Sequence, residues 1–533
     1  MSFSLSSVLI TDEIDQKCVD VLKNNGINVV KNTKLSKDEL LVEIAKYDGL
    51  VVRSATKVTA DVIEAATNLK IIGRAGTGVD NIDCDAASRK GIIVMNTPGG
   101  NTLSAAEHTC ALICASSRHI HQGDRAMKGE NWGERKKLMG SELYGKTLAI
   151  IGLGRIGKEV ALRMQSFGMT TIGFDPIIPG SVSAEFNVEW MALEAIWPKA
   201  DYITVHTPLI PQTRNLINDK VFSLCKRGVR VINVARGGII EEEALLRALE
   251  SGQCGGAGID VYSSEPPKDF SLAKHRNVVA TPHLGASTVE AQQRVAVEIA
   301  EQFVDLVQGK SLFGAVNAPA LTNAMDVNTQ PWIELGKKLG VVAAAVNDQN
   351  KEFSVALYGS SLGKSAGSYM TAAVLAGLLQ NSSLLGAGDS SKLNLVSAPA
   401  LAKQYGINSK STYEEAAPAP YSALVSVVFS NGFRVSGTTS GGQALLVEIQ
   451  GQKFPSPACL CDSVVVFRGT SNPQLIPNVA GALVGAGVTV TSLNTSLETD
   501  GQKWGVATFA TPPSESCLEA LKSLVTAARL IAF

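Results

Sequence analysis

The chain has 533 residues, more than one hydrophobic core usually organises, so we expect three or four domains. Apolar residues make up 45% of the chain and charged residues 18%, a balance typical of globular proteins and not of disordered ones. The formal net charge is −1 and the sequence has no basic tract, which argues against nucleic acids and membrane surfaces as partners.

The sequence also lacks the signals of export or membrane insertion. The longest apolar run, at residues 372–379, is too short to cross a bilayer. The first basic residue is Lys17, so the N-terminus does not resemble a signal or transit peptide. The nine cysteines have neither framework nor zinc-ligand spacing, so we expect reduced thiols and no metal site. We therefore expect a cytoplasmic protein.

Two series of short apolar strands alternate with helical stretches. The first series has strands at residues 8–10, 50–52, 71–72 and 92–94, and a long helix over 104–121 follows it. The second begins at 147–151 and continues at 171–174, 202–205, 229–233 and 258–259. Strands that alternate with helices predict βα units around a parallel sheet, so each series predicts one α/β domain.

The sequence changes character after about residue 315. Residues 316–321 suggest a turn-like joint, and an Ala/Gly/Ser-rich helical stretch and an exposed loop at 414–420 follow. The segment FPSP at 454–457 suggests a domain boundary. Beyond it, strands at 464–467, 488–493 and 504–509, two helices and a final strand at 530–532 predict a small ferredoxin-like domain.

A dinucleotide-binding fingerprint, GLGRIG at residues 152–157, directly follows the strand 147–151 and opens a helix. Gly152 permits the tight turn, Gly154 lets a pyrophosphate approach the backbone, and Gly157 lets the helix pack on the strand. The amide groups and the positive dipole end of the helix would face the phosphates. The surrounding strand and helix make this fingerprint far more specific than an isolated glycine pattern.

Asp175 stands 18 residues after Gly157, at the end of the second strand of this series. Its carboxylate could accept hydrogen bonds from the ribose hydroxyls of NAD and would repel the 2′-phosphate of NADP. No arginine follows within residues 176–179 to reverse this preference. A purely structural aspartate at the strand end is the alternative. We expect NAD as the cofactor.

Five motifs together resemble the D-isomer-specific 2-hydroxyacid dehydrogenase family, in the family's order and at its spacing. They are GLGRIG at 152–157, VHTPL at 205–209, NVARGG at 233–238, DVYSSEPP at 260–267 and TPHLG at 281–285. The chain is most similar to the long-form, animal-type phosphoglycerate dehydrogenases. The resemblance implies a Rossmann-type NAD domain inserted in a flavodoxin-like substrate domain, then an intervening α/β domain and a ferredoxin-like domain of ACT type.

This resemblance sets the expected domain boundaries and chemistry. We expect a substrate-binding domain at 1–99 and 284–315, an NAD-binding domain at 100–283, an intervening domain at 316–455 and an ACT-like domain at 456–533. The implied reaction is NAD-dependent oxidation of 3-phospho-D-glycerate to 3-phosphohydroxypyruvate, the first step of L-serine biosynthesis. The implied assembly is a homo-oligomer, a dimer or tetramer.

Arg236, Glu265 and His283 are the candidate catalytic residues. Oxidation of a 2-hydroxy acid needs a cation for the carboxylate, and the planar fork of Arg236 suits that role. His283 can take the hydroxyl proton, and Glu265 can fix its tautomer and favour its cationic form. Ser287 and Glu290 have the spacing of a capping box, which would place His283 just before a helix. Singly, such residues are usually caps or solvated charges; jointly, they predict catalysis.

The resemblance also implies contacts to cofactor and substrate. It brings to the cofactor Thr77, Gly152, Gly154, Arg155, Ile156, Gly157, Asp175, Thr207, Ala235 and Asp260. His206, beside Thr207, we interpret as structural. The residues it brings to the substrate are Arg53, Ser54, Gly78, Asn101, Arg135 and Arg236. Arg53 follows a strand at the end where α/β sheets place ligands, whereas Arg135 could equally be a solvated charge.

Two other functions stay open at this stage. The chain could be a dehydrogenase of another 2-hydroxy acid, such as glycerate, or a reductase of hydroxypyruvate. It could also be an NAD-sensing binding protein like the corepressors built on this fold, although their scaffold lacks an ACT-type module. The turn at 472–478, NPQLIPN, lacks the glycine of serine-binding relatives, so regulation by serine is not predicted.

Overall fold

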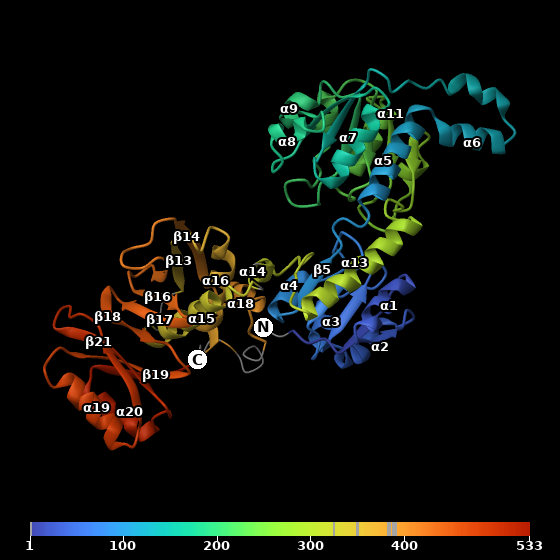
Figure 1. Ribbon diagram of the computed structural model, residues 1–533. Helices are drawn as coiled ribbons and strands as arrows, with labels where there is room; N and C mark the ends of the chain where they lie inside the picture. Colours follow the sequence, from blue (N-terminus) through green and yellow to red (C-terminus); the bar gives the residue numbers. More distant parts are fainter. Residues whose placement is uncertain (1–2, 323, 325, 348–350, 381–384, 386–391) are drawn as a thin grey trace. The chain divides into compact units, whose positions relative to one another are not determined.

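The computed structural model describes residues 3–322, 324, 326–347, 351–380, 385 and 392–533 (Figure 1). The chain divides into two compact units, one of Met1–Ile14, Cys18–Asn96 and Ile299–Phe533, the other of Asp15–Lys17 and Thr97–Glu298. Most of the second unit is thus inserted within the sequence of the first. In the described part of the chain, no helix has the length and apolar character needed to cross a bilayer.

The first sheet has five parallel strands in the order β2-β1-β3-β4-β5, the flavodoxin-like order that the sequence predicts. Its strands are β1 (Ser7–Ile10), β2 (Asn28–Lys31), β3 (Gly49–Val52), β4 (Ile71–Arg74) and β5 (Ile93–Asn96). The connecting helices are α1 (Gln16–Asn24), α2 (Lys37–Glu43), η1 (Ile44–Lys46), α3 (Ala60–Ala65) and α4 (Cys84–Arg89).

The central strands of this sheet, β1, β3 and β4, are rich in apolar residues, many of them β-branched. Residues of β1, β3 and β4 are almost fully buried, as expected of a parallel sheet covered on both faces. Helix α13 (Val289–Val307) lies so close to β4 that a Cβ at Gly73 would come within 2.7 Å of Ile299 and Phe303. Gly73 therefore lets the end of α13 cover the first sheet.

The second unit contains a seven-stranded parallel sheet in the order β12-β11-β10-β9-β6-β7-β8. Counted from β6, this is the 3-2-1-4-5-6 Rossmann order with one added strand, and it confirms the predicted fold. The strands are β6 (Thr147–Ile151), β7 (Thr170–Phe174), β8 (Glu189–Trp190), β9 (Tyr202–Val205), β10 (Val229–Asn233), β11 (Cys254–Ile259) and β12 (Val278–Ala280). The helices between them are α7 (Arg155–Gln165), α8 (Gly180–Ala184), α9 (Leu193–Ile196), α10 (Asp219–Leu224), α11 (Glu242–Glu250) and α12 (Ser271–Lys274).

The helix expected over 104–121 is two helices. Helix α5 (Thr102–Ser117) ends before His119, whose φ of 52° is left-handed and cannot continue a helix. Helix α6 (Ile120–Lys128) and the short helix η2 (Trp132–Lys137) follow, and neither has a buried residue. Both project from the body of the second unit (Figure 1). The sequence prediction missed this break because no glycine or proline marks it.

The third sheet is mixed, with β13 and β14 parallel and the other neighbours antiparallel. Its order is β14 (Asn408–Glu414), β13 (Glu352–Tyr358), β15 (Leu424–Phe429), β16 (Arg434–Ser440), β17 (Gln443–Ile449) and β18 (Gln452–Cys459). Its helices are α14 (Pro319–Thr322), α15 (Gln330–Val346), α16 (Ala366–Gln380) and α18 (Ser397–Gln404).

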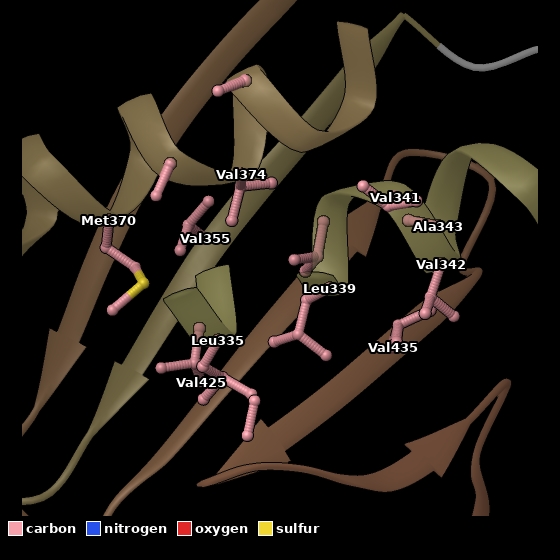
Figure 2. Packing of buried hydrophobic residues seen from close by; sticks show 14 of the residues in the cluster. Leu335, Leu339, Val341, Val342, Ala343, Val355, Met370, Val374, Val425 and Val435 are labelled. Carbon is pink, nitrogen blue, oxygen red and sulfur yellow. The ribbon is translucent and has the colours of Figure 1, made fainter. Parts of the chain in front are cut away.

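Helices α15 and α16 pack on each other and on this sheet. Figure 2 shows Leu335 and Leu339 of α15 near Met370 and Val374 of α16, above the strand residue Val425. The two helix backbones touch through glycines: a Cβ at Gly377 would collide with the Lys337 carbonyl, and one at Gly340 would collide with the Val374 carbonyl. These two glycines set the distance between the helices.

The segment 454–457, which the sequence suggested as a domain boundary, lies inside β18, which pairs with β17. The two prolines of this segment suggested a connection between domains. β18 is an edge strand, however, and an edge strand tolerates a residue that has no amide donor. The connection to the next sheet follows at residues 460–462, after β18 ends.

The fourth sheet is antiparallel, in the order β20-β21-β19-β22. Its elements are β19 (Ser463–Thr470), α19 (Leu475–Gly485), β20 (Val490–Thr495), β21 (Gln502–Phe509), α20 (Glu515–Leu524) and β22 (Ala527–Ala532). This βαββαβ arrangement confirms the ferredoxin-like prediction, including its last strand.

We expect Gly377→Ala to lower the stability of the α15–α16 pair by about 1–3 kcal/mol, because the added methyl group must push the two helices apart. Gly481→Ala is the matched control, since Gly481 lies in α19 with open space around its Cα. That change should stabilise by about 0.5–1 kcal/mol through helix propensity. Calorimetric unfolding of the full chain measures both, and an unchanged Gly377→Ala transition would contradict the close packing.

Candidate active site

The glycine loop between β6 and α7 has the geometry that a dinucleotide needs. Gly152 has a φ of 99°, and a Cβ there would lie 2.6 Å from the His206 carbonyl oxygen. A Cβ at Gly157 would collide with the Gly152 carbonyl, so the helix can approach the strand only with glycine at this position. Gly154 is the N-cap of α7 and has open space beside it. The amides at the start of α7 are therefore open to an anionic ligand.

Thr207 lies beside this loop, with its Cγ2 in contact range of Gly152. Its Oγ1 is buried and has no hydrogen-bond partner among the described residues, so a ligand could accept from it or donate to it. The neighbouring His206 bonds to Thr204 through Nε2 at 3.0 Å. Burial lowers the pKa of His206 to about 3, which keeps it neutral and agrees with a structural role.

Asp175 follows β7 and is tied to the glycine loop. Its carboxylate accepts hydrogen bonds from the Leu153 amide at 2.9 Å, from the Ile177 amide at 2.8 Å and from the Ile178 amide at 3.0 Å. An ionised carboxylate has about four acceptor positions, so these contacts leave capacity for a ribose hydroxyl. The geometry accommodates both the structural and the cofactor-binding interpretation.

His283 and Glu265 form a short ion pair or hydrogen bond, with Nδ1 and Oε2 separated by 2.6 Å. This contact occupies Nδ1, so Nε2 is the ring nitrogen outside the pair. Burial raises the pKa of Glu265, but hydrogen bonds from His283 and the Tyr262 amide, with the charges of His283 and Arg236, outweigh it and lower the pKa overall. The lowered pKa favours the ionised form of Glu265, whose carboxylate holds Nδ1 of His283.

Arg236 leaves β10 in a turn held by Asn233, whose side-chain amide donates to the Arg236 carbonyl at 2.8 Å and whose Oδ1 accepts from the Ala235 amide at 3.0 Å. The next residue, Gly237, lies against the backbone of Tyr262, where a Cβ would collide. This close approach brings the arginine turn next to the loop of Glu265. The charges of Arg236 and His283 are both among the causes that lower the pKa of Glu265.

Asp260 braces the turn that follows His283. It is fully buried and accepts from the Leu284 amide at 2.7 Å, the Gly285 amide at 2.8 Å and the Thr281 hydroxyl at 2.6 Å. Burial raises the pKa of Asp260, but these bonds and one from His108 lower it overall. The family resemblance implied that Asp260 contacts the cofactor. The hydrogen bonds of its carboxylate show that Asp260 holds the turn after His283.

His108 was not predicted as part of the site. It lies on α5, and its Nε2 is 3.0 Å from the Thr281 hydroxyl and 3.3 Å from an Asp260 oxygen. The sequence offered no signal for it, because a single histidine within an apolar helix does not indicate which distant loop it meets.

The capping-box prediction at Ser287 is wrong by one residue. Helix α13 begins at Val289, and the Thr288 hydroxyl accepts from the Ala291 amide at 3.1 Å. Thr288 also bonds to Ser104 at 2.7 Å, which a reading of local sequence could not anticipate. His283 still lies shortly before the helix, in a turn where its φ is 56°.

In the first unit, buried Asp12 organises the loop that carries Arg53 and Ser54. Its carboxylate accepts from the Arg53 amide at 2.6 Å and from the Thr56 amide at 3.0 Å. The Arg53 Nε is buried without a partner among the described residues, and burial lowers the pKa of its guanidinium. Arg53 is thus a cation with unused donor capacity. Asp12 was missed, although its place after the strand 8–10 was a usable signal.

The remaining predicted residues lie in several separate loops and helices. Thr77 and Gly78 follow β4 in the first unit, where Asn96 donates to the Thr77 carbonyl. Arg155, beside the half-buried Ile156, starts α7 and donates to the Pro98 carbonyl at 3.2 Å, and Asn101 is the N-cap of α5. Arg135 is exposed on η2, 5.8 Å above the ring of Trp132. Among the described residues, no group of three His, Cys, Asp or Glu side chains could hold a metal ion.

Comparisons with known proteins agree with this geometry. The family model of the D-isomer specific 2-hydroxyacid dehydrogenase NAD binding domain matches residues 110–285, and that of the D-3-phosphoglycerate dehydrogenase intervening domain matches residues 328–450. The D-3-phosphoglycerate dehydrogenase of Homo sapiens is 50% identical over 538 residues, which cover 99% of each chain.

Two solved structures share the fold of the first two domains. A glyoxylate reductase from Paecilomyes thermophila is 26% identical with a TM-score of 0.54, over 59% of this chain and 99% of that one. A D-lactate dehydrogenase from Aquifex aeolicus, complexed with NAD and lactic acid, is 27% identical with a TM-score of 0.51, over 57% of this chain and 96% of that one. The chain therefore belongs to the D-isomer specific 2-hydroxyacid dehydrogenase family, in its D-3-phosphoglycerate dehydrogenase branch.

Proposed function

We propose that the protein uses NAD to oxidise 3-phospho-D-glycerate to 3-phosphohydroxypyruvate, the first step of L-serine biosynthesis, in the cytoplasm. The observation that carries this proposal is the His283–Glu265 pair, 2.6 Å apart and within the field of Arg236. A base with its orienting carboxylate and a carboxylate-binding cation is what hydride transfer from a 2-hydroxy acid requires. The near full-length similarity to D-3-phosphoglycerate dehydrogenases supports the choice of substrate.

The proposed mechanism gives each side chain one task. Arg236 binds the substrate carboxylate through two parallel hydrogen bonds and so fixes the C2 carbon. His283 removes the proton of the C2 hydroxyl through Nε2, and Glu265 stabilises the imidazolium that results. NAD supplies the acceptor for the hydride that leaves C2 as the carbonyl forms. In the reverse direction His283 returns the proton to the carbonyl oxygen.

Cofactor binding is proposed for the glycine loop and its neighbours. The start of α7 would hold the pyrophosphate at Gly154, Arg155 and Ile156. The Thr207 hydroxyl, which has no partner among the residues that the structure describes, would add a polar contact. Asp175 would accept from the ribose. Thr77, Ala235 and Asp260 are proposed to lie near the cofactor by resemblance alone.

The phosphate of the substrate needs positive charge besides Arg236, and Arg53 is the candidate with structural support. Its buried Nε lacks a partner among the described residues, as expected of a group that awaits an anion. Ser54, Gly78 and Asn101 are proposed as further substrate contacts on resemblance. Arg135 would act from a neighbouring subunit.

A homo-oligomer is proposed because α6, η2 and the segment that follows η2 leave large apolar side chains in solvent. Ile120, Met127, Trp132 and Met139 are 56%, 58%, 66% and 87% exposed. Such a surface is typical of one that a second copy covers.

We also propose four domains with the boundaries expected above, except that the last domain begins after β18. The four sheets and the two family models support this division.

Replacing His283 with Ala should lower kcat by about 10²–10⁴-fold, because general base catalysis is lost. NAD affinity should change little, since the glycine loop remains. Steady-state kinetics and NAD titration measure the two effects. His275→Ala, in the same domain, is the control and should retain activity. An equal loss of turnover and NAD binding would remove His283 from the role of base.

Replacing Asp175 with Ala should weaken NAD binding by about 10–100-fold, the effect of losing hydrogen bonds to a charged group. Binding of NADP should fall less, because the repulsion of its 2′-phosphate is removed as well. Titration with each dinucleotide gives the ratio, and thermal unfolding checks that the glycine loop is intact. A ratio equal to that of the unaltered protein would refute the ribose assignment.

The substrate is tested by comparing 3-phospho-D-glycerate with D-glycerate. We expect a higher kcat/KM for the phosphorylated acid, and we expect Arg53→Met to reduce that value by about 10–100-fold while sparing D-glycerate. Lys57→Met changes an exposed charge in the same loop and is the control. Equal specificity constants for the two acids would overturn the phosphorylated substrate, although not the dehydrogenase chemistry.

A further inference from the structure

His108 lies on α5, in a part of the helix that packs closely on the seven-stranded sheet. A Cβ at Gly258 of β11 would come within 2.9 Å of Leu112 Cβ. Leu112 is buried and stands four residues after His108, so the two side chains share one face of α5. Strand β11 ends at Ile259, directly before Asp260. The close packing therefore carries the His108 side chain to the loop that follows β11.

The contacts of His108 form a chain of hydrogen bonds that ends at Asp260. The Thr281 hydroxyl donates its single proton to Asp260 Oδ1 at 2.6 Å, so its oxygen can only accept from His108 Nε2, which lies 3.0 Å away. Nε2 is therefore the protonated nitrogen of the His108 ring. The same nitrogen lies 3.3 Å from Asp260 Oδ1. His108 thus reaches the Asp260 carboxylate both directly and through Thr281.

The Asp260 carboxylate needs these donors because it is completely buried. A carboxylate has about four acceptor positions. The Leu284 amide at 2.7 Å and the Gly285 amide at 2.8 Å use two of them. Thr281 and His108 supply the other two. Burial raises the pKa of Asp260, and the hydrogen bond from His108 is the largest of the interactions that lower it. Loss of this donor would leave a buried charge short of one partner, which is costly in a folded protein.

The Asp260 loop in turn holds the backbone of His283. The Asp260 carbonyl accepts from the His283 amide at 2.8 Å, and the two amides that the carboxylate holds belong to the next two residues. His283 has a left-handed φ of 56°, so its turn depends on such bonds. From this turn, Nδ1 of His283 reaches Glu265 Oε2 at 2.6 Å.

We propose that His108 is a positioning residue, which keeps the Asp260 carboxylate where it holds the His283 imidazole against Glu265. His108 acts through Asp260 and differs in this from the side chains that would meet the substrate. It also differs from a packing residue, because a leucine could fill the same space on α5 but could not donate to a carboxylate. This inference rests on the proposed function, since it takes His283 as the base.

Steady-state kinetics with 3-phospho-D-glycerate and NAD over a range of pH tests this proposal. His108→Leu keeps the helix and most of the side-chain volume but removes the donor. We expect kcat to fall about tenfold, the typical effect of one hydrogen bond to a charged group, with little change in NAD affinity. The limb of the kcat/KM profile that reports the base should move to lower pH. An imidazole held less firmly against Glu265 is less stable as the cation.

Two further variants separate positioning from stability. His108→Gln keeps an N–H donor near the place of Nε2, so it should restore most of kcat and return the limb toward its original pH. His275→Leu is the matched control, because His275 lies in the same unit and its Nδ1 accepts from the Asn277 amide. It should leave kcat and the limb unchanged. A loss of folded protein alone would lower kcat without moving the limb.

Thermal unfolding checks that His108→Leu is folded. If it is not, Thr281→Val decides, because it removes the hydroxyl that links His108 to Asp260 and should cause the same two changes. The proposal is overturned if the deciding variant keeps the kcat and the limb of the unaltered chain, or if His108→Gln is no better than His108→Leu. An unaltered chain that oxidises no 2-hydroxy acid would overturn the proposed function as well, whereas an active chain with insensitive His108 variants overturns this inference alone.

Discussion

The candidate active site is built around one short contact, between Nδ1 of His283 and the Glu265 carboxylate at 2.6 Å. His283 makes this contact from a left-handed backbone with φ at 56°, which a non-glycine residue adopts at a cost of about 1–3 kcal/mol. Asp260 offsets that cost, since its carbonyl accepts from the His283 amide at 2.8 Å and its carboxylate holds the next two amides. A buried carboxylate and its own backbone carbonyl thus hold the turn that carries the imidazole.

Neighbouring residues also hold the turn that carries Arg236. The arginine itself stays half-buried, whereas Asn233 fixes its turn and Gly237 lets that turn approach Tyr262. Interactions with His283 and Arg236 lower the pKa of Glu265, which favours its ionised form. The candidate catalytic residues are therefore polar and partly exposed, and the residues that place them are buried or small.

Sequence alone predicted the parts of this arrangement that repeat a local pattern. The glycine loop, the parallel strands and the three catalytic candidates each have fixed neighbours in sequence, so spacing was informative. His108 and Asp12 were missed because their partners, at Asp260 and Thr56, are more than 40 residues away. The end of α5 before His119 was missed for another reason. The backbone of His119 is left-handed, and histidine is not a residue type from which a helix end is predicted.

The error at 454–457 shows why the last third of the chain is difficult to divide. Proline is a reliable sign of an ended strand only where both edges of that strand pair with other strands, and β18 is the terminal strand of its sheet. The apolar face of β19 and β21 then continues the core of the third sheet through Val464, Val466 and Val506. Lys338 of α15 adds a bond to the Leu460 carbonyl at 2.6 Å. A cut at residue 455 would sever an edge strand and expose that face, so the boundary between the third and fourth sheets has to be placed after β18.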